Sequence, residues 1–310
     1  MITIAGFNTS LDRTALADEL RAGAVNRVRD VRTYPGGKGL HVALTVAALE
    51  EPVRLVGLID EPHRSLFDGG LRSAGVEFHG VPTSGRLRTC LAIRERGTGR
   101  ITEILEPGPE TDSDTRNGLC ALFLDLAADS DLAVLSGSVP PGFAEGVYGE
   151  LVSSLRKKGV RCLVDAGGGL LRAALDARPL LIKPNRDELA DLVGGPIDGA
   201  AAAVKAARGL TSKGPELVVV SLGAEGAVAV RGDRACRADA PRVDVANSVG
   251  SGDCLLGGVA VGLGRGMELE EVLRLGVACG TANAMRPETG WVRRADIDAL
   301  LPRVQVRGMD

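Results

Sequence analysis

The chain has 310 residues, of which 45% are hydrophobic and 25% charged, a composition that excludes a disordered chain. Its 37 basic and 40 acidic residues give a net charge of −3, which argues against a protein held on nucleic acid by bulk charge. No apolar run reaches the ~18 residues of a membrane span and no signal-peptide pattern is present, so we expect a cytoplasmic protein with neither membrane nor nucleic-acid partners.

Short apolar segments bounded by glycine, aspartate or proline recur along the chain, at 53–59, 132–135, 162–164, 180–182 and 217–220. Runs of this length are typical of strands buried on both faces. Segments with helical spacing alternate with them, at 115–128, 144–158, 200–212 and 269–285. The alternation predicts parallel βαβ units in a layered α/β fold with right-handed crossovers.

Two stretches, 11–34 and 86–106, depart from this alternation. The first has no clean helical pattern, and Ala24–Val28 mixes polar and apolar residues like an exposed strand. The second has two alternating arms joined by Gly97-Thr98-Gly99, which predicts a β-hairpin. We interpret the two stretches as a small sheet that covers a ligand cleft as a lid. A plain surface hairpin is the alternative, and one domain over residues 1–310 is expected in either case.

The strongest chemical signal is Gly250-Ser251-Gly252-Asp253, followed by an apolar helical run to about Leu263. Backbone N–H groups and the helix dipole favour an anion at such a helix start, and glycines let a phosphate approach. Asp253 beside this site suits a base that takes a proton from an attacking hydroxyl during phosphoryl transfer. Helix capping is the alternative interpretation of Asp253. The string matches neither a Walker A loop nor a dinucleotide fingerprint.

Three further strings carry weaker signals. The double glycine of Gly36–Lys38 precedes a helix, where Lys38 and His41 offer donors to a polar ligand. Asn185 and Glu188 follow a strand, where they could hold Mg²⁺ through water or form a capping box. The glycine turn within 220–226 is by itself only a hairpin-like connection. The six cysteines form no CxxC pair and favour reduced thiols, and the three histidines have no metal-ligand spacing.

In this order and spacing, the four strings resemble the PfkB family of carbohydrate kinases, over about residues 2–303. The phosphosugar branch, which contains the tagatose-6-phosphate kinases and the 1-phosphofructokinases, is most similar at 8–14, 25–28, 135–142 and 182–185. Segments 102–109 and 280–285 resemble tagatose-6-phosphate kinase in particular. The resemblance implies a ribokinase-like three-layer α/β/α sandwich with a mainly parallel central sheet. It also implies a small β-sheet lid that forms a homodimer interface.

The resemblance further implies a kinase that uses ATP and Mg²⁺ to phosphorylate a ketohexose monophosphate. Tagatose 6-phosphate, giving tagatose 1,6-bisphosphate, is the favoured acceptor, with fructose 1-phosphate or fructose 6-phosphate as the others. The base would be Asp253, and the anion hole would be Gly250, Ser251 and Gly252. The sugar phosphate would be held by Asp12, Arg27, Gly36, Gly37, Lys38, His41 and Arg88. ATP and Mg²⁺ would be held by Lys183, Asn185, Glu188 (to the metal through water), Ser221, Gly223 and Asn283.

One residue departs from the pattern of the branch, which usually has asparagine where this chain has His41. Both side chains can donate and accept hydrogen bonds, but the imidazole ring is larger. The departure therefore concerns the identity of the sugar and leaves the kinase chemistry intact. Two alternatives stay open: a kinase for an unphosphorylated sugar or nucleoside, and a non-catalytic sugar-phosphate-binding regulator. The intact Gly250–Asp253 string argues against the regulator.

Overall fold

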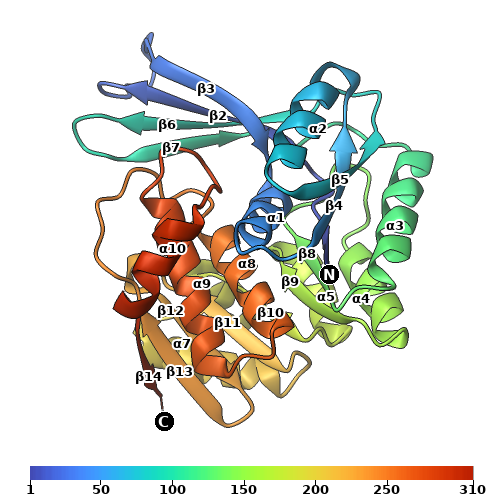
Figure 1. Ribbon diagram of the computed structural model, residues 1–310, viewed down its shortest axis with the longest axis vertical. Coiled ribbons are helices and arrows are strands. Elements are labelled where there is room, and N and C mark those ends of the chain that lie inside the picture. The colour runs from blue at the N-terminus through green and yellow to red at the C-terminus, as the bar shows by residue number, and fades with distance from the viewer. Residues whose placement is uncertain (310) are drawn as a thin grey trace.

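The computed structural model describes residues 1–309 and contains a ten-stranded sheet in the order β14-β13-β12-β11-β10-β9-β8-β1-β4-β5 (Figure 1). The strands from β11 to β5 run parallel, and β12 to β14 add an antiparallel edge. Their bounds are β1 Ile2–Ala5, β4 Val53–Ile59, β5 Val76–Pro82, β8 Leu132–Ser136, β9 Arg161–Asp165, β10 Leu181–Ile182, β11 Leu217–Ser221, β12 Ala227–Arg231, β13 Arg234–Asp239 and β14 Gln305–Gly308. The five apolar segments predicted as buried strands are β4, β8, β9, β10 and β11.

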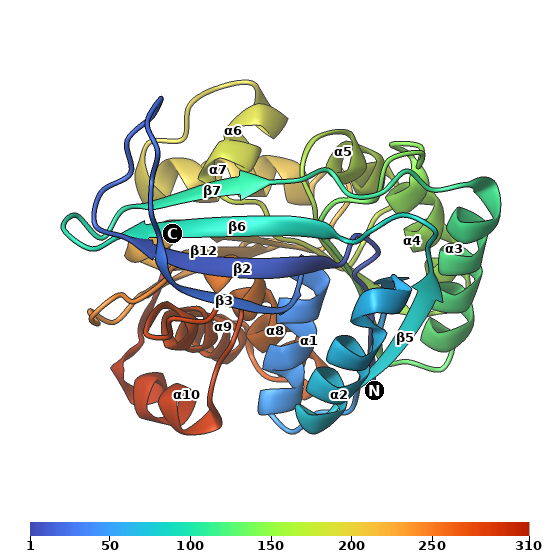
Figure 2. The ribbon, with the colours of Figure 1, turned by 90° about the horizontal axis from the view of Figure 1, so that it is seen from above.

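Helices cover both faces of this sheet (Figure 2). One layer contains α3 Ser113–Ala127, α4 Val147–Lys157, α5 Gly168–Asp176, α6 Arg186–Val193 and α7 Gly199–Thr211. The other contains α1 Lys38–Ala48, α2 Arg64–Ser73, α8 Ser251–Gly264, α9 Leu269–Ala284 and α10 Arg294–Leu300. The ribokinase-like α/β architecture implied by the sequence is confirmed. None of the described helices combines the length and the hydropathy needed to cross a membrane.

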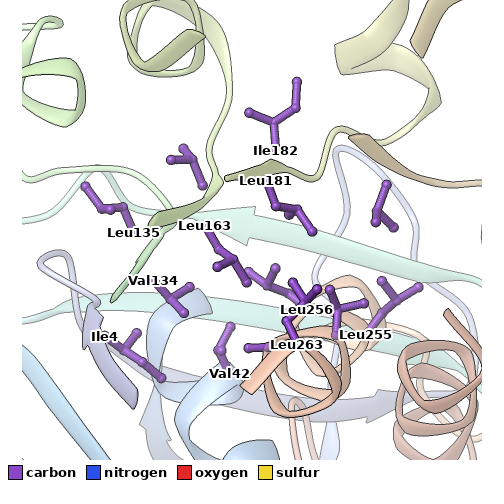
Figure 3. Close-up of a cluster of buried hydrophobic side chains, with 14 of the residues drawn as sticks. Ile4, Val42, Val134, Leu135, Leu163, Leu181, Ile182, Leu255, Leu256 and Leu263 are labelled. Carbon is purple, nitrogen blue, oxygen red and sulfur yellow. The ribbon is translucent and has the colours of Figure 1, made fainter. Parts of the chain in front are cut away.

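The core lies between the sheet and these helices, where Ile4, Val134 and Leu163 meet Val42 and Leu256 (Figure 3). Removing such a fully buried side chain costs about 2–5 kcal/mol. The six cysteines are all free, as expected.

Helix α8 lies inside this core, and every residue from Asp253 to Leu263 is buried. A Cβ atom at Gly258 would lie 2.8 Å from Cys279 Sγ on α9, and one at Gly257 would lie 2.6 Å from Thr45 Cβ on α1. Neither position has room for a larger residue, so the glycines of α8 let α1 and α9 pack closely against it. This packing fixes where the first turn of α8 lies relative to α1 and α9, and it thereby fixes the position of Asp253.

A second sheet has four strands in the order β3-β2-β6-β7, with β2 Ser10–Ala17, β3 Arg29–Gly36, β6 Arg88–Glu95 and β7 Ile101–Leu105. It stands apart from the main sheet at the top of Figure 1, which confirms the small separate sheet. The expected strand at Ala24–Val28 is wrong, because β3 begins only at Arg29. Gly23 has a positive φ of 75°, and the Asn26 side chain bonds to the backbone of Arg21, so this segment folds into a turn.

Candidate active site

A cavity of about 1520 Å³ lies between the second sheet and the carboxyl ends of the parallel strands. Its walls come from β2, α1, β6 and β7 on one side, and from the ends of β9, β10 and β11 with the start of α8 on the other. Ligands bind at this edge of open α/β sheets because polar groups at several strand ends converge there. Most of the residues singled out from the sequence line this one cavity.

The start of α8 forms one wall of the cavity. Gly250 precedes the helix with a left-handed φ of 83°, and the Ser251 and Asp253 amides donate to Ser248 and Gly250. Within residues 1–309, the amides of Gly250 and Gly252 have no hydrogen-bond acceptor. Unpaired N–H groups at a helix start bind anions. The loop therefore has the unpaired amides that the predicted anion hole requires, with Asp253 in the first turn of the helix.

Asn283, expected at the nucleotide, braces this loop from behind. Its Nδ2 donates to the Val249 carbonyl at 2.9 Å and to Ser251 Oγ at 3.0 Å. Asn283 is fully buried on α9 and does not line the cavity. Its contacts with the nucleotide would therefore be indirect, through the shape of the loop.

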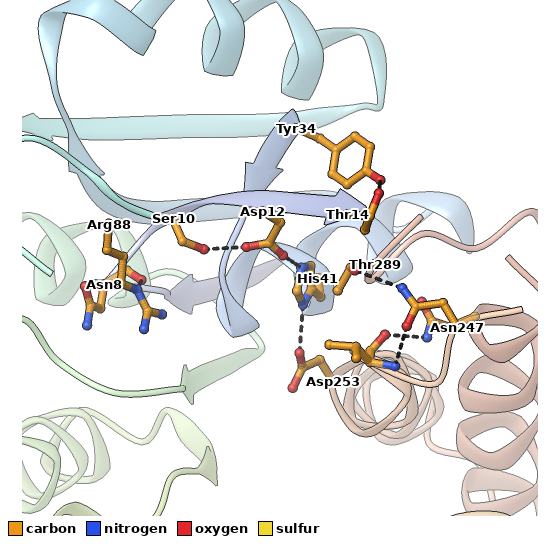
Figure 4. A network of polar contacts seen from close by, with 12 residues as sticks. Asn8, Ser10, Asp12, Thr14, Tyr34, His41, Arg88, Asn247, Asp253 and Thr289 are labelled. Carbon is orange, nitrogen blue, oxygen red and sulfur yellow. Dashed lines mark hydrogen bonds and ion pairs between the residues drawn. The ribbon is translucent and has the colours of Figure 1, made fainter. Parts of the chain in front are cut away.

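His41 connects two carboxylates that lie far apart in the sequence (Figure 4). Its Nδ1 lies 2.8 Å from Asp253 Oδ2, and its Nε2 lies 2.9 Å from Asp12 Oδ2. All three side chains are buried. Burial lowers the pKa of His41, but the hydrogen bonds and negative charges of Asp12 and Asp253 outweigh it and raise the pKa to about 10. Burial opposes ionisation of Asp12, yet the bonds from His41 and Ser10 lower its pKa overall.

Two lysines bring positive charge toward the anion hole. Lys183, just after β10, has its Nζ 3.2 Å from Asp165 Oδ2, and a Cβ atom at Gly252 would lie 3.6 Å from the same Nζ. Lys38, the first residue of α1, also lines the cavity. The negative charge of Asp165, more than offsetting burial, raises the pKa of Lys38 above its ordinary value, with smaller contributions from Asp253 and Glu188. Two ammonium groups beside free amides suit a polyphosphate.

Asn185 and Glu188 form the capping box that was the alternative interpretation of this pair. Asn185 Oδ1 accepts from the Glu188 amide, and Glu188 Oε2 accepts from the Asn185 amide, both at 2.8 Å. Both residues also line the cavity. Glu188 Oε1 lies 3.6 Å from where a Cβ atom at Gly167 would be. The box thus aims one carboxylate oxygen along the Gly167 side of the cavity, so capping and ligand binding are compatible.

Asp165 is a site residue that sequence reasoning missed. It ends β9, lines the cavity and is 1% exposed, and within the described residues the polar partner of its carboxylate is Lys183 Nζ, 3.2 Å from Oδ2. A polar residue directly after the apolar strand 162–164 was the available signal.

Within residues 1–309 no group of three or more potential ligand side chains could hold a metal. The donors present, Asp165 and Glu188, fit Mg²⁺, which keeps several waters and needs only one or two carboxylates.

The groups expected at the sugar phosphate are only partly brought together. Arg88 lines the cavity, where its Nε donates to the Asn8 carbonyl at 3.1 Å. Arg27 is exposed in the connection between β2 and β3 and does not line the cavity. Gly36 lies against the Asp12 carboxylate, which a Cβ atom there would overlap. The remaining predicted residues, Gly37, Ser221 and Gly223, line the cavity.

Glu103 is a second missed residue. It comes from β7 of the second sheet and lines the cavity. Burial raises its pKa, and the nearby Asp12 and Asp253 add to that shift. Strand alternation alone could have placed it on the inner face of the hairpin, but not opposite Asp253.

Comparison with known proteins agrees with this geometry. The model of the pfkB family carbohydrate kinases matches residues 7–291. A structure of phosphofructokinase-2 from Escherichia coli in complex with substrates and products has a TM-score of 0.90 and 27% identity, over 97% of this chain and 98% of that one. A Thermotoga maritima protein described as a possible 1-phosphofructokinase has a TM-score of 0.87 and 23% identity over the full length of both chains. A ribokinase from the same organism has a TM-score of 0.79 and 20% identity, over 97% of this chain and 99% of that one. The last two show the fold alone.

Proposed function

The chain belongs to the pfkB family of carbohydrate kinases and is an ATP-dependent sugar kinase, and from this premise we propose that its acceptor is a ketohexose monophosphate. Tagatose 6-phosphate is the acceptor that the sequence favours, and fructose 6-phosphate and fructose 1-phosphate are the others. The similarity to phosphofructokinase-2 supports a phosphorylated ketohexose as the acceptor class. The observation that carries the proposal is Asp253 in the first turn of α8, beside two free backbone amides and facing a cavity with two lysines.

In this mechanism Asp253 accepts the proton of the attacking sugar hydroxyl. The amides of Gly250 and Gly252 stabilise the transferring phosphoryl group, whose charge is spread over its oxygens. Lys183 neutralises the phosphates of ATP. Bound Mg²⁺, held through water by Glu188 and Asp165, would supply further neutralisation of the phosphate charge. Because such a transition state is loose, positioning and charge account for most of the rate acceleration.

Arg88 is the group best placed to bind the phosphate that the acceptor already carries. It lines the cavity on the side of the second sheet, and a guanidinium suits a phosphate dianion. Lys38 lines the same cavity and assists it. Arg27 would reach the ligand only from the exposed connection between β2 and β3.

We also propose that the second sheet is a lid and the interface of a homodimer. Val31 on β3 is 46% exposed, and Val25 and Val28, in the connection between β2 and β3, are 83% and 39% exposed. Ile104 and Leu105 on β7 are 57% and 59% exposed. Exposed apolar residues gathered on one small sheet and on the connection between two of its strands favour burial against a partner.

The test is ADP release with MgATP across tagatose 6-phosphate, fructose 6-phosphate, fructose 1-phosphate, fructose, ribose and adenosine. Turnover on one ketohexose phosphate, abolished in Asp253→Asn but not in the exposed Asp191→Asn of α6, is the expected result. ATP binding should survive Asp253→Asn, because the amides and lysines remain. Turnover confined to unphosphorylated acceptors would overturn the acceptor class, and an Asp253→Asn variant with a near-normal rate would overturn the role of the base.

A further inference from the structure

The two ring nitrogens of His41 are both engaged by carboxylates. An acceptor oxygen stands 2.8 Å from Nδ1 and another 2.9 Å from Nε2. Ionised carboxylates only accept hydrogen bonds, so the ring must donate from both nitrogens, and an imidazole that does so is an imidazolium. His41 is 4% exposed, and within the described residues its ring nitrogens make no other hydrogen bond. It has no ring nitrogen left for a sugar hydroxyl.

The surroundings of the ring are shaped to hold it. Gly290, with a φ of +72°, lies against the ring so closely that a Cβ atom there would overlap the Cδ2 and Cγ atoms of His41. The same glycine packs against the anion hole, since a Cβ atom at Gly250 would lie 2.8 Å from the Gly290 amide nitrogen. Asn247 Nδ2 donates to Thr289 Oγ1 at 3.0 Å and fixes this segment (Figure 4). The ring thus touches the base on one side and the loop behind the anion hole on another.

The contacts of Asp253 and Asp12 indicate how the His41 ring acts on the two carboxylates. Within residues 1–309 Asp253 receives its side-chain hydrogen bond at Oδ2 only, from His41, which leaves Oδ1 for the acceptor hydroxyl. Asp12 lies on β2 of the second sheet, whereas His41 and Asp253 lie on α1 and α8. Ser10 Oγ donates to the other oxygen of Asp12 at 2.7 Å. The ring therefore links the candidate base to the sheet that covers the cavity.

We propose that His41 is a positioning residue for phosphoryl transfer, an imidazolium that holds Asp253 with Oδ1 toward the acceptor hydroxyl and ties it to Asp12, the group expected to bind the same sugar. This inference rests on the proposed function. It makes His41 act through the two carboxylates, in place of direct bonds to sugar hydroxyls. Asn is not equivalent, because its two N–H donors sit on a single nitrogen and it carries no positive charge.

Positioning by an imidazolium depends on pH. Above a pKa of about 10 the ring loses one proton and can donate to only one carboxylate. The groups around it, besides Asp12 on β2 and Asp253 on α8, are Lys38 on α1, Arg88 and Cys90 on β6, Glu103 on β7 and Tyr34 on β3. Because several of them also titrate in alkali, the protonation of the ring is best measured directly.

The first experiment is nitrogen NMR of the ¹⁵N-histidine-labelled protein without ligands. The chain has three histidines, so His41→Asn identifies the ring signals of His41 by their loss. At about pH 8, where an ordinary histidine of pKa ~6.5 is neutral, both ring nitrogens of His41 should carry protons. A neutral ring at that pH would overturn the proposal, and this measurement needs no turnover.

The second experiment compares the kinetics of His41→Asn with those of His79→Asn, which removes an imidazole from β5 that also contacts a carboxylate. We expect kcat to fall about 10- to 100-fold in His41→Asn, since small misplacement of a reacting group costs this much. KM for ATP should change less than about twofold, and the loss of kcat expected near pH 10 in the unmodified protein should disappear. His79→Asn should match the unmodified protein.

The outcomes separate the two proposals. Unchanged kcat and an unchanged pH profile in a folded His41→Asn variant would refute the positioning role while leaving the kinase intact. No turnover by the unmodified protein on any acceptor would refute the proposed function and the positioning role with it, whereas the NMR result would still decide whether the ring bridges the carboxylates. A melting curve shows whether the variant is folded.

Discussion

Gly290→Ala tests whether the His41 ring is held as tightly as its contacts indicate. Gly290 has a φ of +72°, and the new Cβ atom would overlap the ring and lie 2.6 Å from His41 Cβ. The ring cannot swing away without breaking its bonds to Asp12 and Asp253, which are 2.9 and 2.8 Å long. The backbone cannot yield easily either, because Gly290 packs against Gly250.

The expected loss has two parts. A left-handed conformation costs a residue with a Cβ atom about 1–2 kcal/mol, and overpacking a buried site costs about 1–3 kcal/mol. The free energy of unfolding should therefore fall by about 2–5 kcal/mol, against a typical total of about 5–15 kcal/mol. Gly266→Ala is the matched control, because Gly266 has a φ of +68° and nothing within 4 Å of its Cβ position. It should show the conformational cost alone.

Urea denaturation followed by circular dichroism gives both free energies, with the slope of each transition as a check on two-state unfolding. The difference between Gly290→Ala and Gly266→Ala measures the contact with the ring. If the two variants lose the same free energy within about 0.5 kcal/mol, the reasoning fails. His41 would then have room to move, and the case for a fixed imidazolium would be weakened with it.

Three further outcomes are expected. The pKa of His41 is about 10 in the folded chain, against ~6.5 in the unfolded chain. The contribution of His41 to the free energy of unfolding is therefore full below pH ~6.5 and is lost as pH rises through ~10. Urea denaturation at several pH values should show this decline in the unmodified protein and not in His41→Asn. Glu188→Gln should raise the Mg²⁺ concentration needed for half-maximal turnover roughly tenfold, which a Mg²⁺ titration at fixed ATP checks, and an unchanged requirement would remove Glu188 from the metal site. Val25→Asp combined with Val28→Asp should convert a dimer to a monomer in light scattering, since both side chains are exposed in the connection between β2 and β3 of the second sheet. A particle of unchanged mass would place the interface elsewhere.

Sequence patterns were sufficient for the parts of the site that are local in the chain. Gly250 and Asp253 were predictable because a glycine turn followed by an apolar run defines a helix start, and the physics of that start depends on adjacent residues. The capping box of Asn185 and Glu188 is local in the same way. Ala24–Val28 failed because its alternation was outweighed by a glycine at positive φ and by the bonds of the Asn26 side chain.

What joins these parts was decided by the tertiary structure. Asp12, His41 and Asp253 are 29 and 212 residues apart, and no pattern along the chain says that their carboxylate and imidazole atoms will meet. They meet because glycines of α8 let α1 pack closely against it, and because β2 belongs to the second sheet, which lies over the cavity. Asp165, at the end of β9 in the main sheet, and Glu103, on β7 of the hairpin, line the same cavity. The sequence determined which chemical groups the chain contains and which local structures they begin. Packing determined the distances between them, and with those distances the charge of His41.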